Sequence, residues 1–433
     1  MLQHVGDRVT GEGMGMAGLA AIAAAVTLTA LRMPVALALM GAGAAGLAWT
    51  GTLDRAWDPV AALLSRPDLW LVPLVLVLGN TAFYAGFATR VHDAAAVILQ
   101  GRRGGLALAA IGGCAGFSAT SGSSLGCAAT MSRIAVPPML QARHDPRLAG
   151  ASVAMGSTLG ALMPPSMLLI VWGLLSGTPV GAMFLAGLLP ALLSLAGMIA
   201  TVLWWVRRDP QAAPLPQSLA ITPGAALRAV WPAPVLFAII VGGIASGLLT
   251  PVAAVAICLA LTLAFGLIQH RLPPETLWCA LRESLRQTAA ILLVLAAAAL
   301  FLSFLDQTGV PAALADWTAA SLPRLAAMAL MGLACAALAL VAEPMAMLVL
   351  LLPFATALAQ AWGLDAVWAG IVVVKLVEIA LVLPPLGLTA IVVAAAIKTV
   401  PPAVILSGIA RFLFADLLVL AAIVLFPALS GWP

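Results

Sequence analysis

The stretch "HDPRLAGASVAMGSTLGALMPPS" (144–166) recurs in diverged form as "LDAVWAGIVVVKLVEIALVLPPL" (364–386). Each copy is a largely apolar run that ends in two consecutive prolines. Because proline removes a backbone hydrogen-bond donor and clashes with the preceding helical turn, each copy predicts a helix that is broken part of the way along. At an offset of 220 residues, the matched positions are Asp145 and Asp365, Gly150 and Gly370, and Pro164-Pro165 and Pro384-Pro385.

The composition around these stretches is that of a membrane protein. Of 433 residues, 63% are hydrophobic and 8% are charged, and the mean hydropathy is +1.13. A soluble protein would need far more charge to cover its surface, and the alternating polarity of a transmembrane β-barrel does not occur. The net charge of +4 reflects topology, so the expected partner is the lipid bilayer and not a nucleic acid. Crossings near or above the length of about 20 residues that spans the hydrocarbon of a bilayer are predicted at 14–31, 34–50, 69–87, 148–176, 181–206, 229–249, 251–268, 287–305, 365–399 and 403–428.

The basic residues predict the orientation, because cytoplasmic loops carry an excess of Lys and Arg. With the N-terminus outside, fourteen Lys and Arg residues fall in the cytoplasm and four fall outside. Two apolar segments remain, 104–137 and 323–358, and each has a polar or proline-containing interruption near its middle. The charge count stays consistent if each enters and leaves on the same side. Both are therefore predicted to be re-entrant hairpins, and both chain termini are predicted to be periplasmic.

The same order of elements surrounds both proline pairs: a span, a short amphipathic stretch (88–101 or 309–321), a hairpin, a broken helix and a closing span. Five crossings separate the first span of one copy from that of the other, so the copies have opposite orientations. The predicted fold class is an all-α polytopic membrane protein with an inverted-topology repeat, typical of secondary transporters. The predicted divisions are 1–68 (N-terminal scaffold spans), 69–206 (first repeat, hairpin 104–137 and broken helix 148–176), 207–286 (linker and scaffold spans) and 287–433 (second repeat, hairpin 323–358 and broken helix 365–399).

Hydroxyls and glycines gather in the middle of the first hairpin, in "FSATSGSSLGCAAT" (117–130), where a plain span would carry Leu and Val. Backbone that is not helical survives at membrane depth only where it is buried in protein or lines a wet cavity. The hairpin tip, 118–124, and the facing proline break would together free several carbonyl oxygens. The hydroxyls expected beside them belong to Ser121, Ser123, Ser124, Thr158 and Ser166.

Such a cage of neutral oxygens suits a hard alkali cation, and half-helix N-termini beside it suit a carboxylate. The cage lacks the buried carboxylate expected of a proton relay, which favours sodium. The alternative is that Ser, Gly and Ala in this stretch only allow helices to pack closely.

The second copy differs in its polar residues. Its hairpin turn carries Glu343, followed by proline, and Gly387 and Thr389 follow its proline pair. Lys375 and Glu378 lie within the second broken helix. An ionisable group at bilayer depth is expensive and suggests function, here contact with the solute. Their spacing of three residues also allows them to pair, so the alternative is a self-neutralised pair that anchors the helix.

An enzymatic function is not supported. A serine hydrolase would need a base near Ser121 or Ser123, but the four histidines lie in loops or at span ends, and the sequence has no HExxH or phosphate-binding P-loop. Four of the five cysteines lie in apolar runs without metal-type spacing. They are predicted to be free and buried, with no disulfide, no transition metal and no organic cofactor.

Several stretches resemble the large membrane subunit of tripartite ATP-independent periplasmic (TRAP) transporters. The N-terminal "LRMPVALALMGAG" (31–43) and the hairpin sequence "SGSSLGCAATM" followed by "AVPPM" are similar to family segments. The most characteristic blocks are "GSTLGALMPPSMLLIVWGLLSGTPVGAMFLAGLLPALL" (156–193) and "WAGIVVVKLVEIALVLPPLGLTAIV" (368–392). The resemblance covers roughly residues 17–432.

This resemblance implies a sodium-coupled transporter of elevator-type fold for carboxylate-containing solutes in the bacterial inner membrane. It also implies a separate small four-helix membrane subunit and a periplasmic solute-binding protein. One sodium site would comprise Ser121, Gly122, Ser123 and Ser124 of the first hairpin with Gly156, Thr158 and Pro164 of the first broken helix. The other would comprise Glu343, Pro384, Gly387 and Thr389. Apart from the resemblance, the polar and ionisable residues themselves lead us to expect that the solute contacts Ser121, Ser166, Lys375 and Glu378.

Three positions depart from the family pattern, which usually has Asn at Lys375, Gly at Ala380 and Asn at Thr389. All three lie near the second predicted sodium site. Two other functions stay open at this point. One is a divalent-anion sodium symporter of similar hairpin architecture that works without a binding protein. The other is a membrane scaffold that transports nothing.

Overall fold

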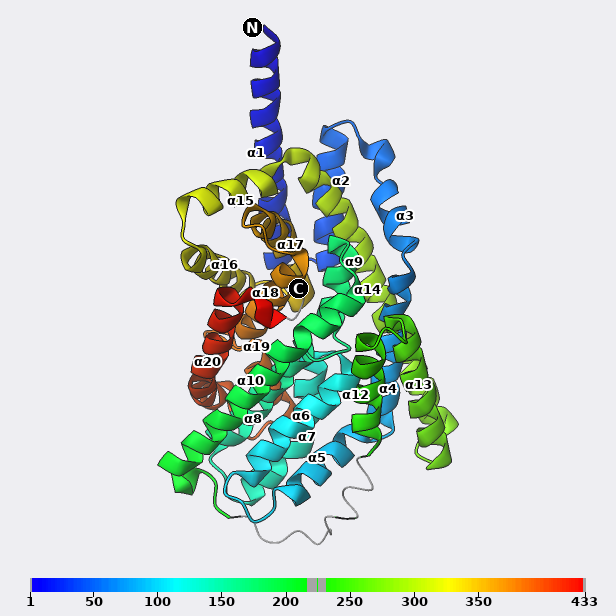
Figure 1. The fold of residues 1–433 in the computed structure, drawn as a ribbon, viewed down its shortest axis with the longest axis vertical. Helices are drawn as coiled ribbons and strands as arrows, with labels where there is room; N and C mark the ends of the chain where they lie inside the picture. The colour runs from blue at the N-terminus through cyan, green and yellow to red at the C-terminus, as the bar shows by residue number, and fades with distance from the viewer. Residues whose placement is uncertain (1, 216–223, 225–230, 431–433) are drawn as a thin grey trace.

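The computed structural model describes residues 2–215, 224 and 231–430, and every regular element within these residues is helical (Figure 1). Seven of the described helices are long and apolar enough to cross a membrane. The start of the crossing predicted at 229–249 lies outside the described residues, which resume at 231; helix α12 begins at Pro232. The span predicted at 287–305 proves to be part of a single helix of 35 residues.

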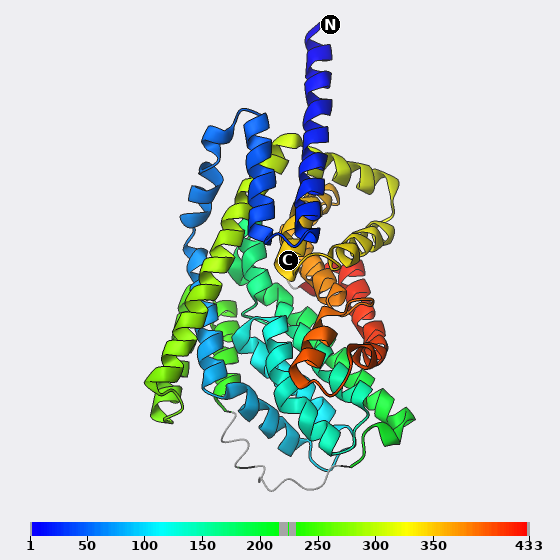
Figure 2. The same cartoon turned by 180° about the vertical axis from the view of Figure 1, so that it is seen from behind.

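Seven described helices form a scaffold along one side of the molecule, and two of them, α4 and α14, correspond to the spans predicted at 69–87 and 287–305, which the sequence-based division counted with the repeats. The longest member of this scaffold, α14, packs against α2 and α4, and Figures 1 and 2 show α2 beside the upper part of α14 and α4 beside its lower part. A Cβ atom at Gly43 of α2 would lie 2.9 Å from the Cα atom of Phe301, so glycine permits this close approach. The scaffold helices are α1 (Leu2–Ala30), α2 (Val35–Trp49), α3 (Asp58–Leu64), α4 (Leu71–Tyr84), α12 (Pro232–Ala245), α13 (Pro251–Ile268) and α14 (Pro274–Thr308).

The first repeat contains a hairpin of two packed helices and a helix in two halves. The hairpin consists of α6 (Gly105–Ser121) and α7 (Ser124–Gln141), and the broken helix of α8 (Pro146–Thr158) and α9 (Met167–Ser176). A shorter helix, α5 (Phe87–Ile98), precedes the hairpin, and the closing span α10 (Val180–Arg208) follows the break.

The second repeat has the same elements in the same order: α15 (Val310–Ser321), α16 (Arg324–Leu338), α17 (Pro344–Ala361), α18 (Ala366–Ala380), α19 (Leu388–Ile397) and α20 (Pro402–Leu425). Figure 1 shows α5 to α7 toward one end of the molecule and α15 to α17 toward the other. The two hairpins therefore approach the centre from opposite ends, and the predicted inverted-repeat fold with two hairpins and two broken helices is confirmed.

Matched residues of the two copies have matched roles. The carboxylates of Asp145 and Asp365 accept hydrogen bonds from the backbone N–H two residues further on, and so cap α8 and α18. Both proline pairs contain a cis peptide bond. A Cβ atom at Gly150 or Gly370 would lie within 2.6 Å of a neighbouring side chain, so both glycines permit close helix packing. Cys114, Cys127, Cys258 and Cys335 are free and buried as predicted, and Cys279 is free and exposed.

Candidate functional site

The tip of the first hairpin is a tight turn between two helices. Helix α6 ends at Ser121, and Gly122 follows with φ of 60°, a left-handed conformation that glycine adopts without steric cost. Ser123 begins α7 as its N-cap, because its hydroxyl oxygen accepts a hydrogen bond from the N–H of Gly126 at 3.2 Å. The "SGSS" sequence thus supplies both the turn and the cap that the tip needs.

This tip is docked on the break of the first broken helix. The carbonyl oxygen of Gly122 accepts a hydrogen bond from the N–H of Met167, the first residue of α9, at 3.2 Å. A Cβ atom at Gly122 would lie 2.6 Å from the carbonyl oxygen of Pro165, and one at Gly160 would lie 3.1 Å from the backbone of Ser123 and Ser124. The two chain breaks predicted to meet at mid-depth therefore do meet.

At this junction some serine hydroxyls form hydrogen bonds, and others have no hydrogen-bond partner among the described residues. The hydroxyl of Ser166 donates to the carbonyl oxygen of Ala161 at 2.5 Å, and that of Ser124 lies 3.5 Å from the carbonyl oxygen of Thr158. The hydroxyl oxygens of Ser118 and Ser121 are buried without a hydrogen-bond partner among the described residues. Buried polar groups are normally satisfied, so these two oxygens are the ones available to a ligand. Ser118 was not among the predicted residues, although it lies in the same serine-rich stretch.

The second hairpin and the second break are arranged differently. Glu343 is the exposed N-cap residue of α17, and its side chain makes no capping hydrogen bond. Gly387, with φ of 49°, begins α19, and the hydroxyl of Thr389 lies 3.5 Å from the carbonyl oxygen of Leu381. Pro384 and Pro385 are exposed, whereas Pro164 and Pro165 are buried. No hydrogen bond joins described residues of this hairpin turn to those of this break.

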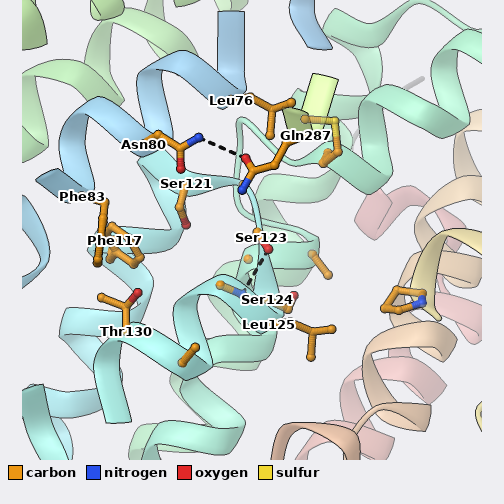
Figure 3. Close-up of a pocket in the computed structure, with 18 of the residues that line it drawn as sticks. Leu76, Asn80, Phe83, Phe117, Ser121, Ser123, Ser124, Leu125, Thr130 and Gln287 are labelled. Atoms are coloured by element: carbon orange, nitrogen blue, oxygen red, sulfur yellow. Dashed lines mark hydrogen bonds between the residues drawn. The ribbon is translucent and has the colours of Figure 1, made fainter. Parts of the chain in front are cut away.

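A cavity of about 810 Å³ lies between the hairpin tips and the scaffold. Helices α4 and α14 form one wall, and the first hairpin tip forms the facing wall (Figure 3). On the scaffold side, the amide nitrogen of Asn80 donates to Gln287 at 3.0 Å and to Ser284 at 2.9 Å. The predicted site residues that line this cavity are Ser121, Gly122, Ser123, Ser124 and Glu343.

The sequence-based prediction missed the other polar residues of the cavity, which include Asn80, Glu283, Gln287, Thr130 and Arg133. Asn80 is a lone amide within an otherwise apolar span, and this is a signal that the sequence offered. Gly79 beside it lets the tip approach α4, because a Cβ atom there would lie 3.0 Å from the Cα atom of Ser121.

Lys375 and Glu378 do not line this cavity; both are fully buried. The Lys375 ammonium nitrogen lies 2.6 Å from an oxygen of Asp416 in α20 and 3.3 Å from Glu378 Oε1. It also donates to the hydroxyl of Ser194 in α10 at 2.8 Å. The predicted pairing of Lys375 with Glu378 is present, but Asp416 is the closer partner and was missed.

Glu378 also reaches the first repeat. Its Oε1 atom lies 2.8 Å from the hydroxyl of Thr158, which stands at the matching position 220 residues earlier. The hydroxyl of Thr158 is also 2.7 Å from the carbonyl oxygen of Met155. The expectation that no carboxylate lies beside the predicted oxygen cage is therefore wrong, because Thr158 was part of that cage. The remaining predicted residues are buried in the first break (Gly156, Pro164, Ser166) or lie in the second (Pro384, Gly387, Thr389).

Together these features define an all-helical membrane protein with an elevator-type ion-transporter fold. Residues 22–429 match the family described as "Tripartite ATP-independent periplasmic transporter, DctM component", and the chain belongs to this family. No group of three or more His, Cys, Asp or Glu side chains placed to hold a metal ion occurs in the part of the chain that the structure describes.

Two relatives and one solved structure illustrate the similarity. The chain is 30% identical to the C4-dicarboxylate TRAP transporter large permease protein DctM of Pseudomonas aeruginosa, over 84% of this chain and 85% of that protein. It is 27% identical to the sialic acid TRAP transporter large permease protein SiaM of Vibrio cholerae, over 91% of this chain and 93% of that protein. The YdaH transporter of Alcanivorax borkumensis has the same fold, with a TM-score of 0.58 at 15% identity over 88% of this chain and 90% of that one.

By their names, the two relatives are permeases for organic acids. The chain is thus a multi-pass protein of the bacterial inner membrane and a large permease of a tripartite transporter family.

Proposed function

We propose that the chain is the large membrane subunit of a binding-protein-dependent transporter that takes up a carboxylate-containing solute together with sodium. The observation that carries this proposal is the first hairpin tip docked on the first helix break. This contact places the unpaired hydroxyl oxygen of Ser121 beside a cavity at the junction of the repeats and the scaffold. Oxygen ligands suit a hard cation, and the cavity has the size of a small-molecule site.

The first sodium site lies at this docked tip and comprises Ser121, Gly122, Ser123 and Ser124 with Gly156, Thr158 and Pro164. Its support is the proximity of the Ser124 hydroxyl to the Thr158 carbonyl oxygen, together with the free oxygen of Ser121. The second site comprises Glu343, Pro384, Gly387 and Thr389. Its support is the unpaired Glu343 carboxylate at the turn of the second hairpin.

The solute occupies the cavity and contacts Ser121 at the tip. The other three residues predicted to contact it do not line the cavity. Ser166 stabilises the break, because its hydroxyl donates within the turn. Lys375 and Glu378 join the two repeats, because their partners lie on α8, α10 and α20.

Transport follows an elevator motion, in which the two hairpins and broken helices move as a unit against the scaffold helices α2, α4 and α14. A small four-helix membrane subunit enlarges this scaffold, and a periplasmic binding protein delivers the solute. Both chain termini face the periplasm, in agreement with the excess of basic residues in the opposite loops. No organic cofactor takes part.

Uptake into proteoliposomes tests the proposal. The chain is reconstituted with the small subunit, and the binding protein is added outside with radiolabelled carboxylates. We expect uptake with an inward sodium gradient and none with a proton gradient in sodium-free buffer. Uptake driven equally well by protons without sodium would refute sodium coupling. Full uptake without the binding protein would favour the divalent-anion symporter, and no uptake under any condition would favour the scaffold.

A further inference from the structure

Arg133 is a charged residue of the cavity that the proposed function does not use. It lies on α7, the second arm of the first hairpin, and it is the one Lys or Arg among the residues that line the cavity. Its side chain is exposed to the cavity, and no described carboxylate or hydrogen-bond acceptor lies within bonding distance of it. The guanidinium group is therefore free to bind a ligand.

The position of Arg133 along α7 indicates that this residue does more than mark the cytoplasmic side of the membrane. A basic residue that marks the cytoplasmic side is expected at the end of a helix, in the loop or beside it. Arg133 precedes the last residue of α7, Gln141, by eight positions, which is about 12 Å along a helix. It also lies about 14 Å from Ser124 at the tip. The guanidinium thus belongs to the interior of the hairpin wall.

The face of α7 that carries Arg133 leads to the hairpin tip. Gly126, Thr130 and Arg133 all line the cavity, and their spacings of four and three residues place them on one helix face. Helical side chains lean toward the N-terminus of their helix, and the N-terminus of α7 is the tip. From this tendency we expect the guanidinium of Arg133 on the tip side of its own Cα atom, facing the cavity that the serines also line.

The two acidic groups of the cavity do not compete for Arg133. Glu283 on α14 is hydrogen-bonded to the hydroxyl of Tyr84 and to the amide of Gln287, each at 3.2 Å. Glu343 belongs to the second hairpin and is assigned to sodium in the proposed function. Once sodium neutralises Glu343 and a second sodium ion occupies the first tip, the cavity carries net positive charge and attracts an anion.

We propose that Arg133 binds a carboxylate of the solute, which lies lengthwise between this guanidinium and the serine oxygens of the first hairpin tip. The planar guanidinium presents two parallel N–H donors that match a carboxylate. This inference deepens the proposed function and rests on it. It assigns Arg133 as a specificity-determining residue that selects solutes with a carboxylate at the end remote from the tip.

Ligand-dependent thermal stabilisation of the purified chain, followed by tryptophan fluorescence, tests this proposal without partner proteins. At saturating sodium, the chain is titrated with succinate, malate, glutamate and gluconate, and then with methyl esters of the tightest binder. We expect esterification of one carboxylate to weaken binding to the wild-type chain about tenfold, since hydrogen bonds to charged groups contribute strongly. In Arg133→Gln the acid and that ester should bind alike, and Arg133→Lys should be intermediate. Arg103→Gln, a change of an exposed loop arginine, is the matched control.

Each other outcome has a defined meaning. An unchanged preference for the acid over the ester in Arg133→Gln would overturn the role of Arg133. Stabilisation by sodium but by none of the four carboxylates would also overturn it, while leaving sodium binding intact. Stabilisation by neither sodium nor any carboxylate would count against the proposed function itself.

Discussion

Replacing Lys375 by methionine should destabilise the protein strongly, because among the described residues the lysine is the one cation paired with two buried carboxylates. Its ammonium group lies 2.6 Å from Asp416 and 3.3 Å from Glu378, and these side chains are 2% and 0% exposed. Each carboxylate also has one oxygen without a hydrogen-bond partner among the described residues. Neither carboxylate therefore has another cation or enough donors to stabilise its charge once the lysine is absent.

The expected loss of stability is large because Lys375, Glu378 and Asp416 are all buried. Removing one partner of a buried ion pair costs about 3–5 kcal/mol, because the remaining charge is left uncompensated. Here one substitution strands two carboxylates, so we expect the upper part of that range. Such a loss is a large fraction of the roughly 5–15 kcal/mol that stabilises a typical folded protein. Most of the Lys375→Met protein should therefore be lost during detergent extraction.

The double variants separate the two partners. Asp416 is the closer partner, so Asp416→Asn should recover more of the loss in Lys375→Met than Glu378→Gln does. Combining all three substitutions should recover most, since every charge is then removed. The assay is the unfolding free energy of the purified variants in a denaturing detergent, with Lys398→Met, the exposed other lysine, as control. Wild-type stability of Lys375→Met, or better rescue by Glu378→Gln than by Asp416→Asn, would refute the reasoning.

Three further substitutions test the first hairpin and its surroundings. Gly122→Val should abolish uptake at near-normal expression, because the left-handed backbone and the nearby Pro165 carbonyl oxygen exclude a side chain at the tip. The control is Gly177→Ala, because Gly177 is also left-handed but has open space around it. Ser123→Ala should lower the unfolding free energy by about 1 kcal/mol through loss of the cap and should also abolish sodium-driven uptake; normal uptake would show that the tip is not the ion site. Burial raises the pKa of Asp145, but the hydrogen bonds and charge of Arg147 outweigh this effect and lower the pKa from its ordinary value. Asp145→Asn should therefore destabilise the protein at neutral pH, and the difference in melting temperature should vanish as the pH falls through the native pKa; a difference that persists in acid would contradict this assignment.

The breaks and turns of the fold could be predicted from the sequence because local chemistry decides them. Pro164-Pro165 and Pro384-Pro385 each follow the end of a helix, and Gly122 followed by a serine N-cap forms the turn of the first hairpin. A proline pair alone is not sufficient to end a helix, because Pro137 and Pro138 lie inside α7. The opposite orientation of the two repeats followed from the odd number of spans between them. These signals identified the first hairpin tip and the break on which it is docked.

The partners across the fold could not be predicted in the same way. Asp416 is a single acid in the apolar run 403–428, and its approach to Lys375 depends on how α18 and α20 pack. Asn80 and Gln287 belong to spans more than 200 residues apart, and no periodic pattern connects them. Arg133 is one of the fourteen basic residues that the sequence analysis counted as cytoplasmic, and the structure places it on the cavity wall. Long-range packing decides all three positions.

The two repeats share a local sequence feature, the proline pair, but differ in the tertiary contact between the hairpin tip and the helix break. Both have the same proline break, and both breaks contain a cis peptide bond. In the first repeat the tip residue is Gly122, whose carbonyl group bonds to α9 and whose lack of a side chain lets the tip reach the buried prolines. In the second repeat the tip is Glu343 followed by a proline without an N–H group, and the facing prolines stay exposed. A proline pair therefore accompanies the helix break in both repeats, whereas the glycine tip docks on the break in the first repeat and the Glu-Pro tip forms no hydrogen bond with the break among the described residues of the second.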